Sequence, residues 1–486
     1  MFGRALGAKR GGPLDQDKTQ DAPARRRAPD LTAGPIGSTM LMFMLPVLGS
    51  NLVQSLNGSA NAFWVSHVLG EAALTATTNA NQILFLMLGA IFGMAMASNI
   101  MIGQAVGARD GALIRRVVGT CTAVFIVISL SVGLLGAALT PAILDAMRTP
   151  ADARADAIAY LRVIFAALPF IYFFTFVMMA QRGLGDARTP FVFAVAQVAL
   201  DIVLNPLLIM GLGPFPQLGI AGSATSTLVS QTLVLAAMLI HLYRRGSPLV
   251  IRPSEARALI PDLTVVRAML FKGAPMGLQM IMVNLAAVAM ISAVNRFGSQ
   301  TAAAYGASWQ LWSYIQMPSM ALGVAVTAMA AQNIGADRMD RVEKVARVGV
   351  LYALALTLGP TLVILATQRW VLQLFLPAGS PSIDIAVHMN LVMIWTFAFF
   401  GVAFVLASVV RAAGVAWVPL LFMFIAYWVV RTPFAYGMMP WLGADAVWLS
   451  FPLGSMTMLI MALAYYRWGP WRSSRMIATA PPPDSP

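Results

Sequence analysis

A single acidic residue lies in the middle of a long apolar stretch, QVALDIVLNPLLIMGLG at residues 197–213. Asp201 is followed one helical turn later by Asn205, and a spacing of four residues places both side chains on the same helix face. Because surroundings of low dielectric constant penalise a charged carboxylate, we expect Asp201 to bind and release a proton in the physiological range. The alternative is a permanently protonated or paired Asp201 that only holds helices together.

Pro206 follows directly after this pair of polar residues. Proline has no N–H to donate and crowds the carbonyl four residues earlier, here that of Ile202. The sequence therefore predicts a kinked helix with a free backbone acceptor within one turn of Asp201. We interpret Pro206 as a hinge beside a titratable group, so that the protonation state would change the bend of the helix.

A stripe of amides occupies the first apolar stretch, LVQSLNGSANAFW at residues 52–64. Gln54, Asn57 and Asn61 recur at i, i+3 and i+7 and therefore share one helix face. Such amides often join helices to one another, but their alignment favours the lining of a cavity. A matching lining in the second half of the chain is predicted from Gln279, Asn284 and Trp309.

The composition indicates which elements hold these side chains. Of the 486 residues, 59% are hydrophobic and 10% are charged, and the mean hydropathy is +0.76, whereas soluble proteins carry about 25% charged residues. Apolar runs near or above the ~20 residues that cross a bilayer as a helix occur repeatedly. The chain is therefore predicted to be an all-α polytopic membrane protein. The twelve predicted spans are 36–66, 72–103, 116–142, 155–181, 190–212, 219–243, 267–295, 301–331, 346–371, 385–411, 415–439 and 444–467.

Several kinds of chemistry lack their sequence motifs. Cys121 is the only cysteine and the three histidines are far apart, so neither a disulfide nor a metal site is predicted. The phosphate-binding pattern G-x-x-x-x-G-K-[ST] does not occur. No nucleophile with a neighbouring base stands out either. We therefore predict a protein that is not an enzyme and that needs no cofactor.

Positive charge predicts the orientation in the membrane. Twelve spans place both termini on one side, and if that side is cytoplasmic the inner segments hold 26 of the 32 Lys and Arg residues. This asymmetry follows the positive-inside rule, so the net charge of +13 reflects topology and not nucleic-acid binding. We expect a multi-pass protein of a prokaryotic plasma (inner) membrane with cytoplasmic termini. The basic residues expected outside or near the outer helix ends are Arg148, Arg154, Arg162, Arg296, Arg369 and Arg431.

The chain contains an internal repeat of nearly half its length. GQAVGARD, from residue 103, is echoed by AQNIGADR, from residue 331, at an offset of 228. QRGLGDARTPF is echoed by VRAAGVAWVPL at an offset of 229, which also separates Pro46 from Pro275, two further predicted hinges. A duplicated six-helix unit keeps its orientation, so we predict two six-helix bundles related by a pseudo-two-fold axis along the membrane normal. The predicted domains are a cytoplasmic basic tail (1–35), an N-terminal lobe (36–243), a cytoplasmic linker (244–266), a C-terminal lobe (267–467) and a cytoplasmic tail (468–486).

These patterns resemble the multidrug and toxic compound extrusion (MATE) antiporters over about residues 36–468. The resemblance rests on NAFWVSHVLGEAALTA, GQAVGAR, RGLGDARTP, LNPLLIMGLGPFPQLGIAGSA and their second-half partners. It implies two bundles that face a central cleft. It also implies export of small organic, often cationic, compounds such as drugs and dyes in exchange for protons or sodium.

The candidate site departs from the pattern of this family. The usual first-span aspartate falls at Asn61, and the usual fifth-span Asn and Asp fall at Asp201 and Asn205, so these two residue types are exchanged. We therefore expect H+ coupling through Asp201, with Na+ held by Asp201, Asn205, Asn61 and carbonyl oxygens as one alternative and loss of coupling as another. The polar cavity residues of relatives fall at Gln54, Asn57, Tyr160 and Ser223.

The main competing class is a flippase or exporter of lipid-linked precursors or polysaccharides within the same superfamily. That function predicts extra spans or a strongly basic central cavity that holds phosphates. The count of twelve spans and the lack of arginines in the middle of spans argue against it. We expect small organic substrates, contact with the lipid bilayer and a monomer.

Overall fold

The computed structural model describes residues 30–477 apart from 147, 148, 150 and 378. Parts of both predicted tails lie outside the described residues. Arg148 lies outside them too. The first half of the chain forms α1 (Ile36–Leu69), α2 (Glu71–Gly107), α3 (Gly111–Ala146), α4 (Ala151–Gly183), α5 (Arg188–Met210) and α6 (Ile220–Arg245). The second half forms η1 (Pro253–Leu259), α7 (Leu263–Asn295), α8 (Ser299–Gly335), α9 (Met339–Leu372), α10 (Pro381–Met393), α11 (Thr396–Ala412), α12 (Trp417–Phe424), η2 (Ile425–Arg431), α13 (Thr432–Leu442), α14 (Asp445–Trp468) and η3 (Pro470–Ser473).

Eleven helices in the described part of the chain are long and apolar enough to cross a membrane. A twelfth crossing results if α10 and α11, which meet at a bend of 42°, count as one span. The all-α membrane fold is thus confirmed, and the span predicted at 385–411 is a bent pair of helices. The span predicted at 415–439 consists of α12, η2 and α13, since η2 is a π-helical segment inside one crossing from Trp417 to Leu442.

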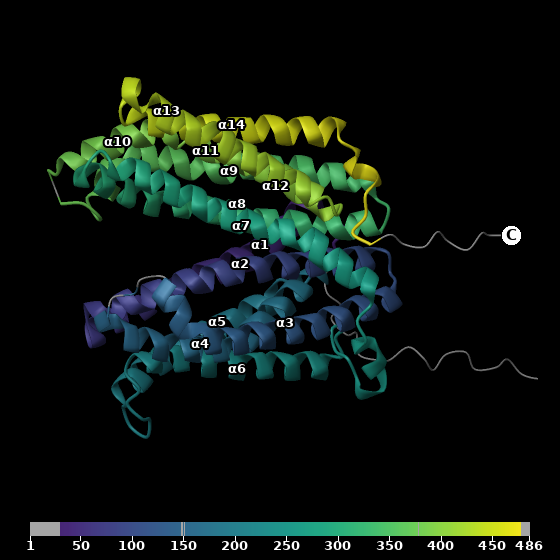
Figure 1. Cartoon of the computed structure of the whole chain (residues 1–486). Coiled ribbons are helices and arrows are strands. Elements are labelled where there is room, and N and C mark those ends of the chain that lie inside the picture. The colour runs from purple at the N-terminus through teal and green to yellow at the C-terminus, as the bar shows by residue number, and fades with distance from the viewer. Residues whose placement is uncertain (1–29, 147–148, 150, 378, 478–486) are drawn as a thin grey trace, which may run out of the picture.

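The helices form two groups that meet along a seam (Figure 1). We name α1–α6 the N-terminal lobe and α7–α14 the C-terminal lobe. Helices α1 and α2 of the first lobe pack against α7 and α8 of the second. Leu31 and Met476, near the two ends of the described chain, both pack at one end of the molecule, where they bond to Asn333 and Gln104. We call this end the terminal face.

Hydrogen bonds across the seam are reciprocal between the two halves. Gln104 of α2 donates its Nε2 to the carbonyl oxygen of Ala412 at 2.7 Å, and Gln332 of α8 donates its Nε2 to that of Gly183 at 2.9 Å. The two glutamines correspond in the sequence repeat, and so do the two residues that accept from them. Each half therefore bonds to the other through the same pair of positions, which is the pattern expected of a duplicated unit.

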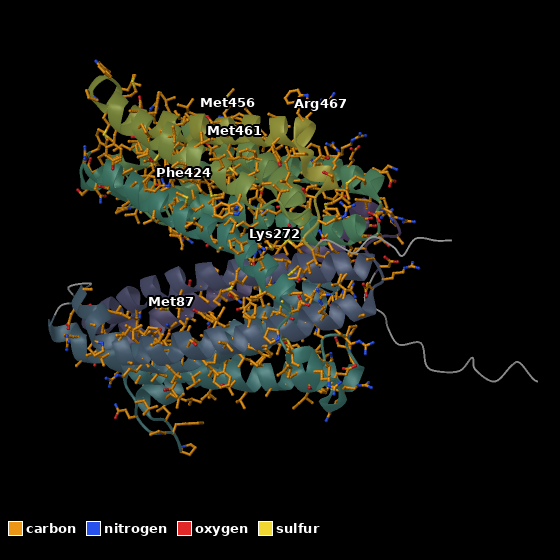
Figure 2. The ribbon with its side chains drawn as sticks, turned by 45° about the vertical axis from the view of Figure 1, so that its right-hand side comes forward. Met87, Lys272, Phe424, Met456, Met461 and Arg467 are labelled. Atoms are coloured by element: carbon orange, nitrogen blue, oxygen red, sulfur yellow. The ribbon has the colours of Figure 1, made fainter. Side chains whose placement is uncertain are left out.

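Close backbone contact also joins the lobes. A Cβ atom at Gly93 of α2 would overlap the backbone of Gly273 and Gly277 on α7. Lys272 precedes this contact by one residue and is labelled in Figure 2 where the two lobes meet. Its Nζ donates to the carbonyl oxygens of Arg475 (2.7 Å) and Met476 (2.9 Å). The glycine contact therefore joins the two lobes, and Lys272 holds the C-terminal segment against α7.

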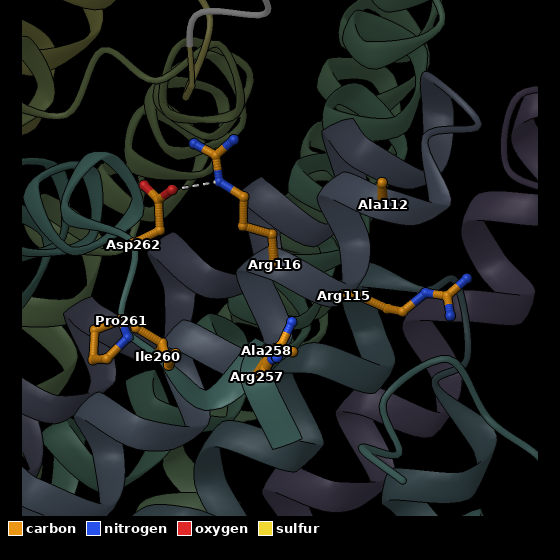
Figure 3. Close-up of a pocket in the computed structure, with 8 residues that line it drawn as sticks. All are labelled: Ala112, Arg115, Arg116, Arg257, Ala258, Ile260, Pro261 and Asp262. Carbon is orange, nitrogen blue, oxygen red and sulfur yellow. Dashed lines mark ion pairs between the residues drawn. The ribbon is translucent and has the colours of Figure 1, made fainter. Parts of the chain in front are cut away.

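The segment between the lobes folds back onto α3. Helix α6 ends at Arg245 and α7 begins at Leu263, where the Asp262 side chain accepts hydrogen bonds from the first turn of α7. Arg115 pairs with Glu255 of η1 at 2.6 Å, and Arg116 pairs with Asp262 at 2.7 Å. Figure 3 shows Arg116 and Asp262 facing each other across this junction. Both ion pairs attach the segment to the N-terminal lobe.

Candidate functional site

Asp201 lies in the middle of α5 and keeps only 2% of its surface exposed. Its Oδ1 accepts a hydrogen bond from Ser226 Oγ at 2.6 Å, and its Oδ2 accepts one from Asn57 Nδ2 at 3.0 Å. Thr227 Oγ1 is a third donor, 3.3 Å from Oδ2. The carboxylate therefore links α5 to α6 through two hydroxyls and to α1 through an amide.

Asn61 forms a second junction one turn further along α1. Its Oδ1 accepts from Asn205 Nδ2 at 2.8 Å and from Ser223 Oγ at 2.5 Å. The hydroxyl of Tyr160 on α4, itself buried, forms a hydrogen bond with the same Asn61 side chain. Four helices of the N-terminal lobe thus contribute to one polar network, and it contains every N-terminal site residue predicted from the sequence except Gln54.

The network holds one acid and no basic side chain. Among the described residues, the ion pairs are confined to other positions, and none of them includes Asp201. Asn205 is 3% exposed, and its Oδ1 accepts no hydrogen bond from the described part of the protein. The network therefore offers a carboxylate and a free amide oxygen in a buried setting. These are the oxygen donors that hard cations and protons bind.

Two members of the network, Ser226 and Thr227, are absent from the sequence prediction. Their signal is present in α6, where GSATSTLVSQ places Ser223, Ser226, Thr227 and Ser230 at i, i+3, i+4 and i+7. This spacing defines one helix face, here a hydroxyl-bearing one that packs against α5. The prediction from spacing followed amides and acids, and the hydroxyls that it included, Tyr160 and Ser223, came from the family resemblance.

The remaining predicted cavity residues do not form one cluster in the structure. Gln54 is exposed, and its side chain has no hydrogen bond within the described structure. Asn284 is exposed and donates to the Met280 carbonyl of its own helix at 3.0 Å. Gln279 is buried and accepts from Arg411 Nη1 at 3.2 Å. Trp309 is 45% exposed, so the C-terminal set is scattered along α7 and α8.

The three predicted hinge prolines each lie inside a helix that continues past them. Pro46 is within α1, Pro206 within α5 and Pro275 within α7. In α1 the carbonyl oxygen of Pro46 accepts from Ser50 Oγ at 2.9 Å. A hinge role for these prolines stays a prediction.

Two cavities lie at the terminal face, and neither includes a residue of the Asp201 network. One, of about 500 Å³, is bordered by Arg115, Arg116, Arg257 and the Ile260–Asp262 segment (Figure 3). The other, of about 510 Å³, lies at the turns after α2 and α8 and includes Arg109 and Arg338. Buried polar chemistry, rather than cavity size, therefore singles out the Asp201 network as the candidate site.

The structure corrects the predicted position of Arg431. Charge counting placed this residue near the outer end of its span, but it lies in the middle of the crossing from Trp417 to Leu442. It is also buried, with 8% of its surface exposed. The statement that arginines are lacking from the middle of the spans is therefore wrong. The error arose because the assignment relied on loops, whereas this arginine sits in a π-helical segment of the helix itself.

A family model named MatE matches the chain twice, at residues 46–207 and 275–437. The two matches cover the two halves of the predicted repeat. The Asp201 network lies within and just after the first match, and Arg431 lies within the second.

Known proteins resemble the chain over most of its length. The "Probable multidrug resistance protein YoeA" of Bacillus subtilis is 32% identical over 90% of this chain and 96% of its own. A "Probable multidrug resistance protein NorM" of Thermotoga maritima is 23% identical over 91% of this chain and 94% of its own. A solved structure described as "MATE in complex with MaL6" superposes with a TM-score of 0.82 at 21% identity, over 90% of this chain and 97% of the other. The chain therefore belongs to the MatE family of membrane transporters.

Proposed function

We propose that this protein is a secondary active antiporter that exports small organic, often cationic, compounds by alternating access and is driven by inward flow of H+. The observation that carries this proposal is the buried Asp201 carboxylate, which has three hydrogen-bond donors and no basic partner among the described residues. An acid inside a membrane span is costly, and such residues commonly mark ion pathways. Relatives with the printed name of multidrug resistance proteins support the substrate class.

The hydrogen bonds suggest how protonation would be transmitted. Ser226 Oγ also lies 2.8 Å from the Ser223 carbonyl oxygen, so its hydroxyl has a second acceptor. When Asp201 gains a proton, Ser226 can turn to that carbonyl and accept from the acid, which keeps α5 joined to α6. The Asn57 amide can only donate at this position, and its bond to a neutral acid is weaker than its bond to a carboxylate. Protonation would therefore loosen α1, the helix that lies at the seam.

Sodium coupling is the second candidate, and the Asn205 Oδ1 atom favours it. This buried oxygen accepts no hydrogen bond from the described residues and lies in the same network as Asp201. Na+ bound by the carboxylate and this oxygen would replace the proton as the coupling ion. Export of lipid-linked precursors is a further alternative, because the buried position of Arg431 removes one of the two arguments against it.

The remaining features of the proposal are topological. We place the protein in a prokaryotic plasma membrane as a monomer with both termini cytoplasmic. The terminal face, with its paired and unpaired arginines, would then be the cytoplasmic side. The positive-inside distribution supports this orientation.

The test is transport of a cationic dye into or out of proteoliposomes under an imposed proton or sodium gradient. Asp201→Asn is compared with the wild type and with Asp145→Asn, which makes the same change at an exposed acid of the same lobe. We expect Asp201→Asn to abolish the response to the gradient and Asp145→Asn to retain it. Full gradient-driven transport by Asp201→Asn would rule out coupling at this site. A wild-type response to sodium alone would replace H+ by Na+.

A further inference from the structure

Arg431 is a buried cation in the middle of a membrane span without a counter-charge. Its guanidinium lies 3.4 Å above the ring centroid of Phe451 and 5.4 Å from that of Tyr427. Its Nε atom has no hydrogen-bond partner, and no ion pair of the described residues includes it. Arginine stays protonated in proteins, so this charge cannot be removed by losing a proton. Something other than an acidic side chain must complete its environment.

Two further donors that contact the same aromatic residues also lack acceptors among the described residues. The hydroxyl of Tyr305 is buried and unpartnered in the described structure, and its ring shares Phe451 as a neighbour with Arg431. Tyr305 and Arg431 therefore both lie against the ring of Phe451. Asn390 uses its Oδ1 to accept from Trp312 Nε1 at 3.0 Å, whereas its Nδ2 has no partner. Three donors of these side chains, Arg431 Nε, Tyr305 Oη and Asn390 Nδ2, are therefore without an acceptor in the described structure.

Aromatic rings surround these donors and connect them to the surface. Tyr305 is stacked with Trp309 at 6.0 Å and with Trp448 at 6.4 Å, and Trp312 meets it edge to face at 5.7 Å. Trp448 is fully buried, but Trp309 is 45% exposed, so the aromatic group extends from the interior of the C-terminal lobe to accessible surface. Flat aromatic walls next to a cation suit a planar molecule that carries a negative group.

Arg431 also lies within one residue of the position that corresponds to Asp201 at the repeat offset of 229. Each residue lies six positions before the end of its MatE match, which ends at 207 in the first half and at 437 in the second. Their offset is 230, one more than the 229 of the preceding repeat positions, and the π-helical segment that ends at Arg431 accommodates such an extra residue. The duplicated scaffold thus presents an acid in one lobe and a base in the other.

We propose that Arg431 and Tyr305 form a binding site in the C-terminal lobe for the anionic group, a carboxylate or a phosphate, of an aromatic substrate. The inference deepens the proposed function, because it assigns a substrate class to the lobe opposite the coupling acid. A carboxylate would accept from the guanidinium and from the Tyr305 hydroxyl and so provide the absent acceptor. Zwitterionic aromatic compounds, with a cationic and an anionic end, are then preferred to purely cationic ones.

A purely structural role for Arg431 makes a different prediction. Stacking on Phe451 would then be its whole purpose, as in other buried cation–π pairs. In that case the substitution Arg431→Gln would affect all substrates equally through the packing of α13 and α14. Selectivity between a free acid and its ester therefore separates the two roles.

The test measures equilibrium binding to the purified full-length protein and does not depend on a gradient. The probes are a zwitterionic rhodamine with a free carboxylate and its methyl ester, which differ only in this group. We expect the wild type to bind the acid about tenfold or more tightly than the ester, as a charged hydrogen bond would provide. Arg431→Gln should remove this preference, Arg431→Lys should retain part of it, and Tyr305→Phe should reduce it. Arg369→Gln, at an exposed arginine of the same lobe, is the matched control.

Two outcomes would overturn the site. Equal binding of acid and ester by the wild type would do so even if Arg431→Gln failed to fold. Equal weakening of both probes in Arg431→Gln would assign the residue to packing. Displacement of the acid probe by benzoate but not by phenyl phosphate, or the reverse, identifies the preferred anion. Because binding is read without a gradient, loss of gradient-driven transport in Asp201→Asn leaves this result intact, so failure of the coupling proposal and of this one are distinguishable.

Discussion

The two lobes treat a buried charge in opposite ways. In the N-terminal lobe, Asp201 receives donors from α1 and α6 that belong to the same lobe. In the C-terminal lobe, Arg431 is faced by aromatic rings and by further donors, none of which can neutralise it. Duplication therefore preserved the scaffold, including the reciprocal glutamine bonds across the seam, but not the chemistry within it. Asp201, whose carboxylate accepts hydrogen bonds from its own lobe, suits a small coupling ion. Arg431, whose guanidinium has no acidic partner among the described residues, suits the anionic group of a larger substrate.

The largest expected effect is on transport, where substitutions of Asp201 and Arg431 should have different consequences. Asp201→Asn should abolish gradient-driven transport of both the zwitterionic rhodamine and its ester, because the only buried acid of the network is lost. Arg431→Gln should retain the gradient response for the ester and lose mainly the transport of the acid. Initial rates in proteoliposomes measure both. If Arg431→Gln also lost the gradient response for the ester, the division of labour between the lobes would be wrong.

Sequence reasoning succeeded for the N-terminal site because its members follow helical spacing. Asn57 and Asn61 lie one turn apart on α1, as do Asp201 and Asn205 on α5, and each amide of one pair bonds to a member of the other. These two pairs were therefore predictable from their spacing. That both pairs meet at the same level of the membrane depends on helix packing, which a single sequence does not contain.

The C-terminal site escaped prediction for a different reason. Arg431 lies within the predicted span 415–439, but the charge count placed it among the residues outside or near the outer helix ends. The crossing runs from Trp417 to Leu442, so Arg431 lies near its middle. Likewise, Tyr305 and Phe451 read as ordinary core aromatics until their position beside a guanidinium is known. The site could not be predicted from residue types, because it depends on contacts between residues that are far apart in the sequence.

The contact between the lobes provides the next largest effect. Gly93→Ala places a methyl group where α2 touches the backbone of Gly273 and Gly277, so the helices must separate. We expect a loss of about 1–3 kcal/mol in stability, as for other overpacked sites. Thermal unfolding in detergent measures this loss. Gly58→Ala is the control, since no atom lies within 4 Å of a Cβ there, and the alanine should be neutral or stabilising in a helix. Equal stability of the two variants would contradict the close approach.

Substitution of the two reciprocal glutamines, Gln104 and Gln332, should reduce stability by smaller and unequal amounts. Gln332 contributes one hydrogen bond across the seam, to Gly183, whereas Gln104 donates to Ala412 and also accepts from the Met476 N–H at 2.9 Å. With about 1 kcal/mol for each hydrogen bond, Gln104→Ala should destabilise the protein more than Gln332→Ala. Chemical or thermal unfolding of both variants checks the order. The reverse order would mean that the C-terminal segment does not hold Gln104.

The smallest effect concerns the linker, whose described ion pairs both join it to the N-terminal lobe. The hydrogen bond from Arg115 lowers the pKa of Glu255, so the interaction stabilises the protein above the usual pKa of a glutamate and is lost as the pH falls through the lowered value. Glu255→Gln should therefore match the wild type at acidic pH and lie slightly below it at neutral pH. Because the pair is exposed, its effect should also fade in high salt. Unfolding temperatures across pH and salt test this. A large loss at neutral pH would show that the linker, and not only the seam, holds the lobes together.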